Sequence, residues 1–193
     1  KTNTVQFALG GIGYNGATGT PPSVAMTDVP RAPGGSSSGA ATSTARGLAA
    51  AGIGSDTGGS VRIPAAWNRL VGLKTSIGVL PTEGVLPLSV SLDTVGPLCH
   101  SVADAAALFT IMAARPDIDL AGASLEGAVF LVCESVVWDQ ADAEVETAVR
   151  AAIARLGQAG ARVEWAKVPE FDEIDAVLNR HGGVVTAEGY VAW

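Results

Sequence analysis

The sequence is poor in charge and in aromatic rings. Only 16% of its 193 residues are charged, against 48% hydrophobic residues, a balance that favours burial of a core over disorder. Basic residues are the scarcer sign of charge: 12 stand against 19 acidic ones, the net charge is −7, and no basic run occurs. Because a nucleic-acid-binding surface needs clustered Lys and Arg, we expect no direct nucleic-acid partner.

Cysteine is scarce, and long apolar runs are missing. Cys99 and Cys133 lie far apart, which excludes a disulfide scaffold and favours two reduced thiols in a cytoplasmic protein. No stretch reaches the roughly 18 uninterrupted apolar residues of a membrane helix. The segment KTNTVQFALGG also lacks the layout of a signal peptide. We therefore expect a cytoplasmic location and no membrane partner.

Small residues are what the sequence has in excess, with 24 glycines. Residues 1–35 are rich in Gly, Pro, Thr and Asn and show no periodicity, so they predict a long loop. Within it, GGIGYNG departs from a dinucleotide-binding fingerprint, because no clear strand precedes it and no helical pattern follows it. A loop of this length inside a folded chain is either functional or disordered.

Small residues after serines and short apolar runs predict short elements in the first half of the chain. We expect one helix at residues 39–46 and a second in SVRIPAAW. Apolar runs predict strands at 48–53, 71–73 and 77–80. Residues 81–97 contain three prolines and read as a loop.

The second half predicts an α/β unit. A capped helix is expected at 101–114, and a further helix from Pro169 onward. Between them lie a buried strand at 127–134, an amphipathic helix at 142–160 and a strand at 161–168. A strand, a helix and a strand at this spacing indicate parallel strands joined by a right-handed crossover.

Two glycine-serine clusters, GGSSSG at 34–39 and DTGGS at 56–60, carry the chemistry that the sequence suggests. A serine hydroxyl attacks a carbonyl only if a neighbour takes its proton, and the oxygen that becomes negative needs backbone N–H donors. The glycines before Ser60 let the chain bend tightly enough to present such donors. Either cluster alone is typical of a flexible loop or a turn, but their joint occurrence is more specific.

The identity of the proton acceptor is open. His100 and His181 are the two histidines, and neither has a distinctive setting, so a Ser–His pair is one alternative. The other is a relay through serine hydroxyls to a neutral lysine, a known variant of the catalytic triad.

The chain resembles the amidase signature family of serine hydrolases. The segments that carry this resemblance are GGSSSGAA, GIGSDTGGSVRIPAAW, VGLKTSIGVL, SLDTVGPL and SVADAA. The resemblance implies an α/β fold with a mixed β-sheet core covered by helices on both faces. Residues 1–193 would form a central portion of that single domain.

The resemblance also implies a Ser, cis-Ser, Lys triad that hydrolyses small-molecule amides through an acyl-enzyme. By motif position Ser60 is the nucleophile, and Ser36, preceded by a cis peptide in the family, is the bridging serine. Thr57, Gly58 and Gly59, with Ser60, supply the oxyanion-hole amides. The chemistry requires no metal and no cofactor, and a homodimer is compatible with the family.

Supporting roles are less specific. Asp56 and Arg62 match positions that support the nucleophile loop, although a buried ion pair or a cap explains them equally well. Arg62 could also meet a substrate carboxylate, and Tyr14 and Trp67 are candidates for either pocket walls or core packing. The substrate-binding residues are unknown, and loop 82–91 is where specificity would reside.

None of the lysines considered matches the family's catalytic lysine, which stands upstream in a Val-Lys-Asp-like segment. Lys1 and Lys74 match other family positions, and Lys167 falls in a later strand. We therefore expect this chain to be a piece of a longer amidase, lacking the N-terminal lysine segment and the C-terminal part. The alternative is a naturally truncated, inactive chain.

Two other functions remain open. The first is the amidase-like subunit of a tRNA-dependent amidotransferase. Those subunits often carry a Phe-Cys-Gly segment after Pro-Ala-Ala, where this chain has AAWNRLVG. The second is a plain α/β binding domain, in which neither serine cluster would have a function.

Overall fold

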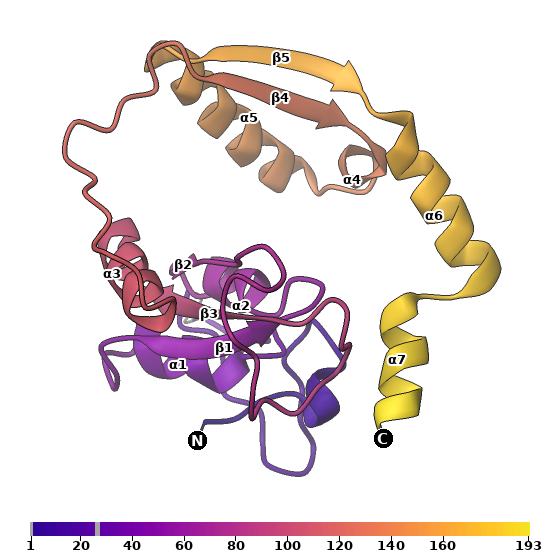
Figure 1. Ribbon diagram of the computed structural model, residues 1–193. Helices are drawn as coiled ribbons and strands as arrows, with labels where there is room; N and C mark the ends of the chain where they lie inside the picture. Colours follow the sequence, from indigo (N-terminus) through magenta and orange to yellow (C-terminus); the bar gives the residue numbers. More distant parts are fainter. Residues whose placement is uncertain (1, 26–27) are drawn as a thin grey trace. The chain divides into compact units, whose positions relative to one another are not determined.

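The computed structural model describes residues 2–25 and 28–193, which fall into two compact units. The first unit combines Lys1–Asp119 with Val184–Trp193, and the second is Leu120–Gly183. Both contain helices and strands (Figure 1), and the predicted α/β class is confirmed. No helix within the described residues is both long and apolar enough to cross a membrane.

The first unit is built on a three-stranded antiparallel sheet in the order β1-β3-β2 (Figure 1). Its strands are β1 (Gly52–Asp56), β2 (Val71–Gly72) and β3 (Thr94–Cys99). Around it lie η1 (Gln6–Ala8), α1 (Ser38–Ala45), α2 (Arg62–Trp67), α3 (Val102–Met112) and α7 (Val184–Ala192). The predicted helices at 39–46, in SVRIPAAW and at 101–114 and the strand at 71–73 are confirmed within one to three residues at each end.

The loop predicted at 81–97 is wrong at its end, because the central strand β3 starts at Thr94. Gly96 and Pro97 concealed this strand, since both residues normally weaken strands or confine them to an edge. Here the carbonyl of Pro97 accepts from Leu73 N–H at 3.1 Å. A side chain at position 96 would collide with the carbonyl of Leu73, so glycine is required there.

Two strand predictions in this unit are also wrong. Residues 46–50 form a turn with Leu48 78% exposed, and β1 starts only at Gly52. Residues 77–80 form a turn, closed by the N–H of Val79 donating to the carbonyl of Ser76 at 3.2 Å. An apolar run forms a strand only where it pairs with another strand. Residues 52 and 53 do so as the start of β1, whereas Leu80 is buried, at 3% exposed, without being part of a strand.

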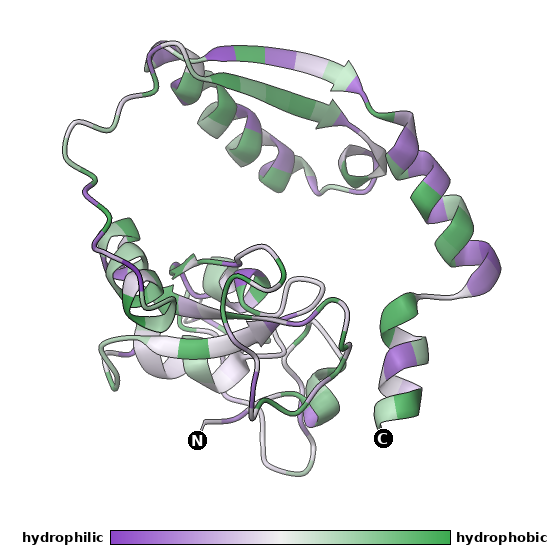
Figure 2. Cartoon of the chain, in the orientation of Figure 1, coloured by the Kyte–Doolittle hydropathy of each residue, from purple (hydrophilic) through white to green (hydrophobic). Residues whose placement is uncertain are grey.

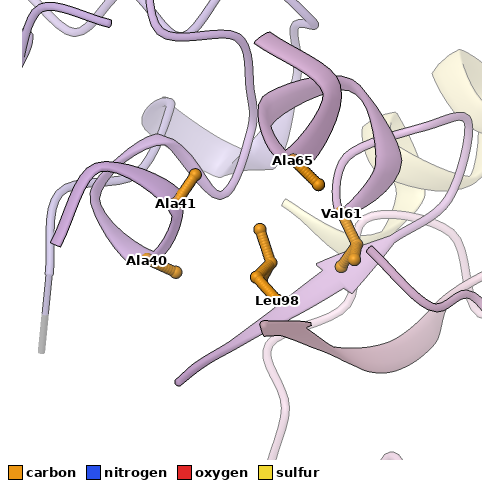
Figure 3. Close-up of a cluster of buried hydrophobic side chains, with 5 residues drawn as sticks. All are labelled: Ala40, Ala41, Val61, Ala65 and Leu98. Carbon is orange, nitrogen blue, oxygen red and sulfur yellow. The ribbon is translucent and has the colours of Figure 1, made fainter. Parts of the chain in front are cut away.

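The core of the first unit is small and made of small side chains. Leu98, on the central strand, lies between Ala40 and Ala41 of α1 on one side and Val61 and Ala65 on the other (Figure 3). Alanines at these positions let the two helices approach the sheet closely. The core therefore fixes the segments that follow the two serine clusters against β3.

The second unit contains two parallel strands, β4 (Val129–Glu134) and β5 (Arg162–Lys167), joined by α5 (Ala143–Gln158). This confirms the predicted strand-helix-strand unit. The short helix α4 (Val136–Asp139) and the predicted helix that starts at Pro169, α6 (Pro169–His181), complete it.

The predicted burial of β4 is wrong. Helix α5 runs along one face of the two strands (Figure 1), while Val129 and Leu131 remain 56% and 52% exposed. Figure 2 shows how apolar β4 is. Parallel strands are normally covered on both faces, so this unit presents an uncovered apolar face.

Both cysteines are free, as predicted. Cys99 is buried, and burial together with the negative charge of Asp104 raises the pKa of its thiol. Cys99 is therefore a core side chain of β3 and not a reactive thiol.

Candidate active site

The GGSSSG loop is buried and braced by the N-terminal loop. The Gly35–Ser36 peptide bond is cis, as the resemblance implies, and Ser36 is 1% exposed. The N–H of Gly35 donates to the carbonyl of Gly11 at 2.7 Å, and that of Gly34 to Ile12 at 3.0 Å. The predicted loop at 1–35 therefore has a structural purpose, because it supports the segment that carries Ser36.

Ser36 is held by its backbone, whereas its hydroxyl is unengaged. Its carbonyl accepts from the N–H of Val5 at 3.0 Å and from Thr4 Oγ1 at 2.8 Å. Its Oγ is buried and has no hydrogen-bond partner among the described residues. A buried hydroxyl without a partner is costly, which makes Ser36 a candidate for a functional contact.

The DTGGS loop turns around the carboxylate of Asp56, which stands at the end of β1 and is fully buried. Its oxygens accept from the backbone N–H groups of Gly59 at 2.7 Å, Val61 at 3.1 Å and Arg62 at 3.3 Å. The guanidinium of Arg62 adds a bidentate pair, with Nε and Nη2 both at 3.0 Å. Five donors on one carboxylate fix the path of the chain on both sides of Ser60.

The charge state of Asp56 follows from these contacts. Burial opposes its ionisation, but the hydrogen bonds from Arg62 and the three amides outweigh burial and hold the pKa of Asp56 below its ordinary value. The same hydrogen bond raises the pKa of Arg62. The supporting role predicted for the pair is therefore compatible with the geometry, and the guanidinium is committed to Asp56.

The structure brings the two serine clusters together. The N–H of Ser37 donates to the carbonyl of Ser60 at 3.2 Å, and Ser37 Oγ donates to the carbonyl of Ser55 at 3.3 Å. The residue after Ser36 is thus bonded to Ser60 itself. This is the proximity that a hydroxyl relay between Ser36 and Ser60 needs.

The three residues before Ser60 are not equivalent. The N–H of Gly59 is engaged by Asp56, so it is not free to face a substrate oxygen. The N–H groups of Gly58 and Ser60 have no partner among the described residues. Thr57 is anchored by its side chain, whose Oγ1 donates to Asp93 Oδ1 at 2.5 Å.

Within the described part of its own unit, His100 contacts neither Ser36 nor Ser60. His100 Nε2 is 2.9 Å from the carbonyl of Thr44 in α1. His181 is exposed in the last turn of α6, in the second unit. For His100 the geometry thus gives the Ser–His alternative no support.

The lysines of the chain do not identify the proton acceptor either. Lys74 Nζ donates to the carbonyl of Thr75 at 3.0 Å, Lys167 belongs to β5 in the second unit, and Lys1 lies outside the described residues.

Tyr14 and Trp67 are 70% and 44% exposed, so neither is a core aromatic.

Asp93 is the residue of this region that sequence reasoning missed. It accepts from Thr57 and from two backbone amides, those of Leu88 and Ser89. The sequence feature that could have indicated Asp93 is an acidic residue directly before a strand, in SLDTVGPL. The signal was hidden because the strand itself was not predicted.

Comparison with known proteins gives a consistent result. The family model described as Amidase matches residues 1–192. The chain is 42% identical, over 190 residues, to 2-amino-5-chloromuconic acid deaminase of Comamonas testosteroni, covering 97% of this chain and 41% of that protein. The chain therefore spans about two fifths of the length of this curated relative.

Solved structures give the same answer. A crystal structure of an amidase superposes with a TM-score of 0.80 at 34% identity, over 99% of this chain and 48% of that one. A glutamyl-tRNA(Gln) amidotransferase subunit of Thermotoga maritima superposes with a TM-score of 0.85 at 30% identity, over 99% of this chain and 44% of the other.

Proposed function

Because the chain belongs to the amidase family, we propose that it is the serine-bearing part of an amide hydrolase in which Ser60 is the nucleophile. The observation that carries this proposal is the contact between the two serine loops. Ser37 N–H is bonded to the carbonyl of Ser60, and the buried hydroxyl of Ser36 has no described partner. Two serines held in this way suit a proton relay better than a structural role.

The proposed reaction proceeds through an ester on Ser60. A neutral lysine outside residues 1–193 takes the proton of Ser36, Ser36 takes that of Ser60, and Ser60 Oγ attacks the amide carbonyl. The carbonyl oxygen becomes negative and is stabilised by backbone N–H groups of the turn. When the C–N bond breaks, the relay returns the proton to the leaving amine. Water, deprotonated by the same relay, then hydrolyses the ester and frees Ser60.

The turn divides its amides between two tasks in this proposal. The N–H groups of Gly58 and Ser60 are free among the described residues and would face the anion. Thr57 is the third candidate donor. Gly59 has a different role from the oxyanion-hole donor predicted from the sequence. Its N–H donates to the carboxylate of Asp56 and so stabilises the turn.

A labelling experiment tests the nucleophile directly. Full-length protein and the chain 1–193 are each treated with a fluorophosphonate and analysed by intact mass and peptide mapping. We expect one adduct on Ser60 in the full-length protein and none in the shorter chain, which lacks the proposed lysine. Labelling of a residue other than Ser60, or none in full-length protein that hydrolyses amides, would reject the proposal.

A second candidate function is that of an amidotransferase subunit. The likeness to the Thermotoga maritima protein favours it, whereas AAWNRLVG in place of a Phe-Cys-Gly segment disfavours it. Ammonia release from a panel separates the candidates. The panel holds simple primary amides, glutamine, and a small 2-amino unsaturated dicarboxylic acid of the kind named for the Comamonas relative. Release from glutamine alone would favour the amidotransferase reading.

The partners follow from the same proposal. A small-molecule amide is the substrate, and no direct nucleic-acid or membrane contact is proposed. The homodimer and the cytoplasmic location stay predictions from sequence, to be checked by light scattering of the full-length protein and by cell fractionation.

A further inference from the structure

We infer that Asp93 is a positioning residue that fixes Thr57, and through it the backbone of the anion-binding turn; this inference rests on the proposed function. Asp93 is remote in sequence from both serine clusters. It nevertheless makes a side-chain hydrogen bond to the turn that precedes Ser60. No substrate contact is assigned to it.

The pairing of two strands places Asp93 beside Thr57. In the antiparallel register Asp56, the last residue of β1, faces Thr94, the first residue of β3. Thr94 Oγ1 also donates to the carbonyl of Asp56 at 2.7 Å. Thr57 follows the one strand and Asp93 precedes the other, so the register itself brings their side chains within reach.

The carboxylate of Asp93 is held in place by hydrogen bonds to both of its oxygens. Oδ1 accepts from Thr57 Oγ1 at 2.5 Å, and Oδ2 accepts from the N–H groups of Leu88 at 2.8 Å and Ser89 at 3.1 Å. The N–H of Asp93 donates to the carbonyl of Ser89 at 2.9 Å. Both oxygens and the backbone are thus engaged, and Thr57 is tied to a closed turn and not to a free side chain.

The turn is consequently held by two carboxylates, those of Asp56 and Asp93. Asp56 binds the amides after Ser60 and that of Gly59, whereas Asp93 binds the side chain of Thr57. Thr57 is β-branched and stiff at χ1, so fixing its Oγ1 restricts the backbone that carries the next amides. Donors aimed at a developing oxyanion lose much of their effect when they are displaced by an ångström or less.

The test is a double-mutant cycle in the full-length enzyme, with kcat and KM for amide hydrolysis and the thermal unfolding midpoint as readouts. Thr57→Val removes the hydroxyl but keeps the shape, and Asp93→Ala removes the acceptor. We expect Thr57→Val to lower kcat about 10- to 100-fold, with KM changed less than about threefold. In the Asp93→Ala background, Thr57→Val should lower kcat by no more than about twofold further.

Conservative replacement separates positioning from folding. Thr57→Ser keeps the donor, and we expect kcat within about threefold of wild type. If Asp93→Ala does not fold, the contrast between Thr57→Val and Thr57→Ser decides the matter. Equal kcat in these two variants, or full multiplication of the Thr57→Val and Asp93→Ala losses, would overturn the inference.

The proposed function has a separate control in the same assay. The Ser60→Ala variant should be inactive whether or not Asp93 positions Thr57. An inactive Ser60→Ala variant together with a fully active Thr57→Val variant would remove the role of Asp93 alone. Activity in Ser60→Ala would remove the proposed function, and the role of Asp93 with it.

Discussion

The backbone N–H of Ser37 donates a hydrogen bond to the carbonyl oxygen of Ser60 at 3.2 Å. Because this bond joins main-chain atoms, it does not depend on the hydroxyls of Ser36 or Ser60. Either hydroxyl can therefore be removed without cutting the link between the two loops. Changes in rate on such removal report on chemistry and not on a collapse of the site.

Replacing the two serines by alanine should separate nucleophile from relay. We expect Ser60→Ala to lower kcat of the full-length enzyme about 10⁴-fold or more, because Ser60 is the group proposed to form the acyl-enzyme. Ser36→Ala should lower kcat about 10²- to 10⁴-fold, the usual contribution of a positioned proton-transfer group. The measurement is ammonia release at saturating substrate.

Ser43→Ala is the matched control. Among the described residues its hydroxyl donates to the carbonyl of Ala40 within α1, at 3.2 Å. It should retain wild-type activity. A Ser36→Ala enzyme as active as Ser43→Ala would remove Ser36 from the mechanism and leave the Ser60 assignment standing.

Asp56→Asn should destabilise the protein in a pH-dependent way. Five donors converge on a buried carboxylate, and losing its charge should cost about 3–5 kcal/mol of unfolding free energy near pH 7. The pKa of Asp56 is lower in the folded protein than its ordinary 3.8. Its stabilisation is therefore complete above the unfolded pKa and is lost as the pH falls through the folded pKa.

Urea unfolding at pH 7, 5 and 3 measures this dependence. The difference in unfolding free energy between wild type and Asp56→Asn should be constant from pH 7 to 5. It should be smaller at pH 3, because below 3.8 the unfolded chain binds a proton at this carboxyl that the folded protein does not. Asp117→Asn, at an exposed loop position, should change the unfolding free energy little at any pH. A difference that grows toward acid pH would contradict the direction of the pKa shift.

The apolar face of β4 should drive association of the chain 1–193. Leu131 is 52% exposed beside Glu164, its partner in the parallel register, and exposed apolar patches favour self-association. We expect concentration-dependent oligomers by light scattering, reduced by Leu131→Lys. Glu164→Gln changes the net charge by the same amount and should not reduce them. Equal behaviour of the two variants would mean that charge, and not apolar contact, controls association.

Local patterns in the sequence were enough to predict the strand-helix-strand of the second unit and helices α1, α2 and α3 of the first. Helix α5 and its flanking strands have long, one-sided apolar patterns that local rules detect. Strand β3 was missed because its glycine and proline oppose a strand locally, and tertiary contacts override that preference. Gly96 is needed where the carbonyl of Leu73 approaches the strand.

The candidate site was predictable as a set of residues but not as an arrangement. Motif positions indicated Ser36 and Ser60, and the structure joins their loops. The spacing of residues in the sequence could not predict that the N–H of Gly59 donates to Asp56, because this depends on the orientation of one carboxylate. Nor could it find Asp93, whose place beside Thr57 follows from the register of the strand that was missed.

The two glycines before Ser60 should respond differently to a methyl group. Gly59 has φ +126°, a conformation strained for any L side chain, and its added Cβ would lie 2.6 Å from Ile63 Cδ1. The Ile63 methyl group can move, but the backbone strain remains. Gly59→Ala should therefore cost about 1–3 kcal/mol of unfolding free energy. It should also lower kcat, because relief of the strain turns the N–H away from Asp56 and shifts Ser60.

Gly58→Ala is the matched control for stability, because nothing lies within 4 Å of its added Cβ. We expect its unfolding free energy to stay within about 1 kcal/mol of wild type. Urea unfolding of both full-length variants gives the comparison. Equal destabilisation by the two alanines would mean that the turn tolerates a side chain at Gly59. The bond from its N–H to Asp56 would then not be what fixes the approach to Ser60.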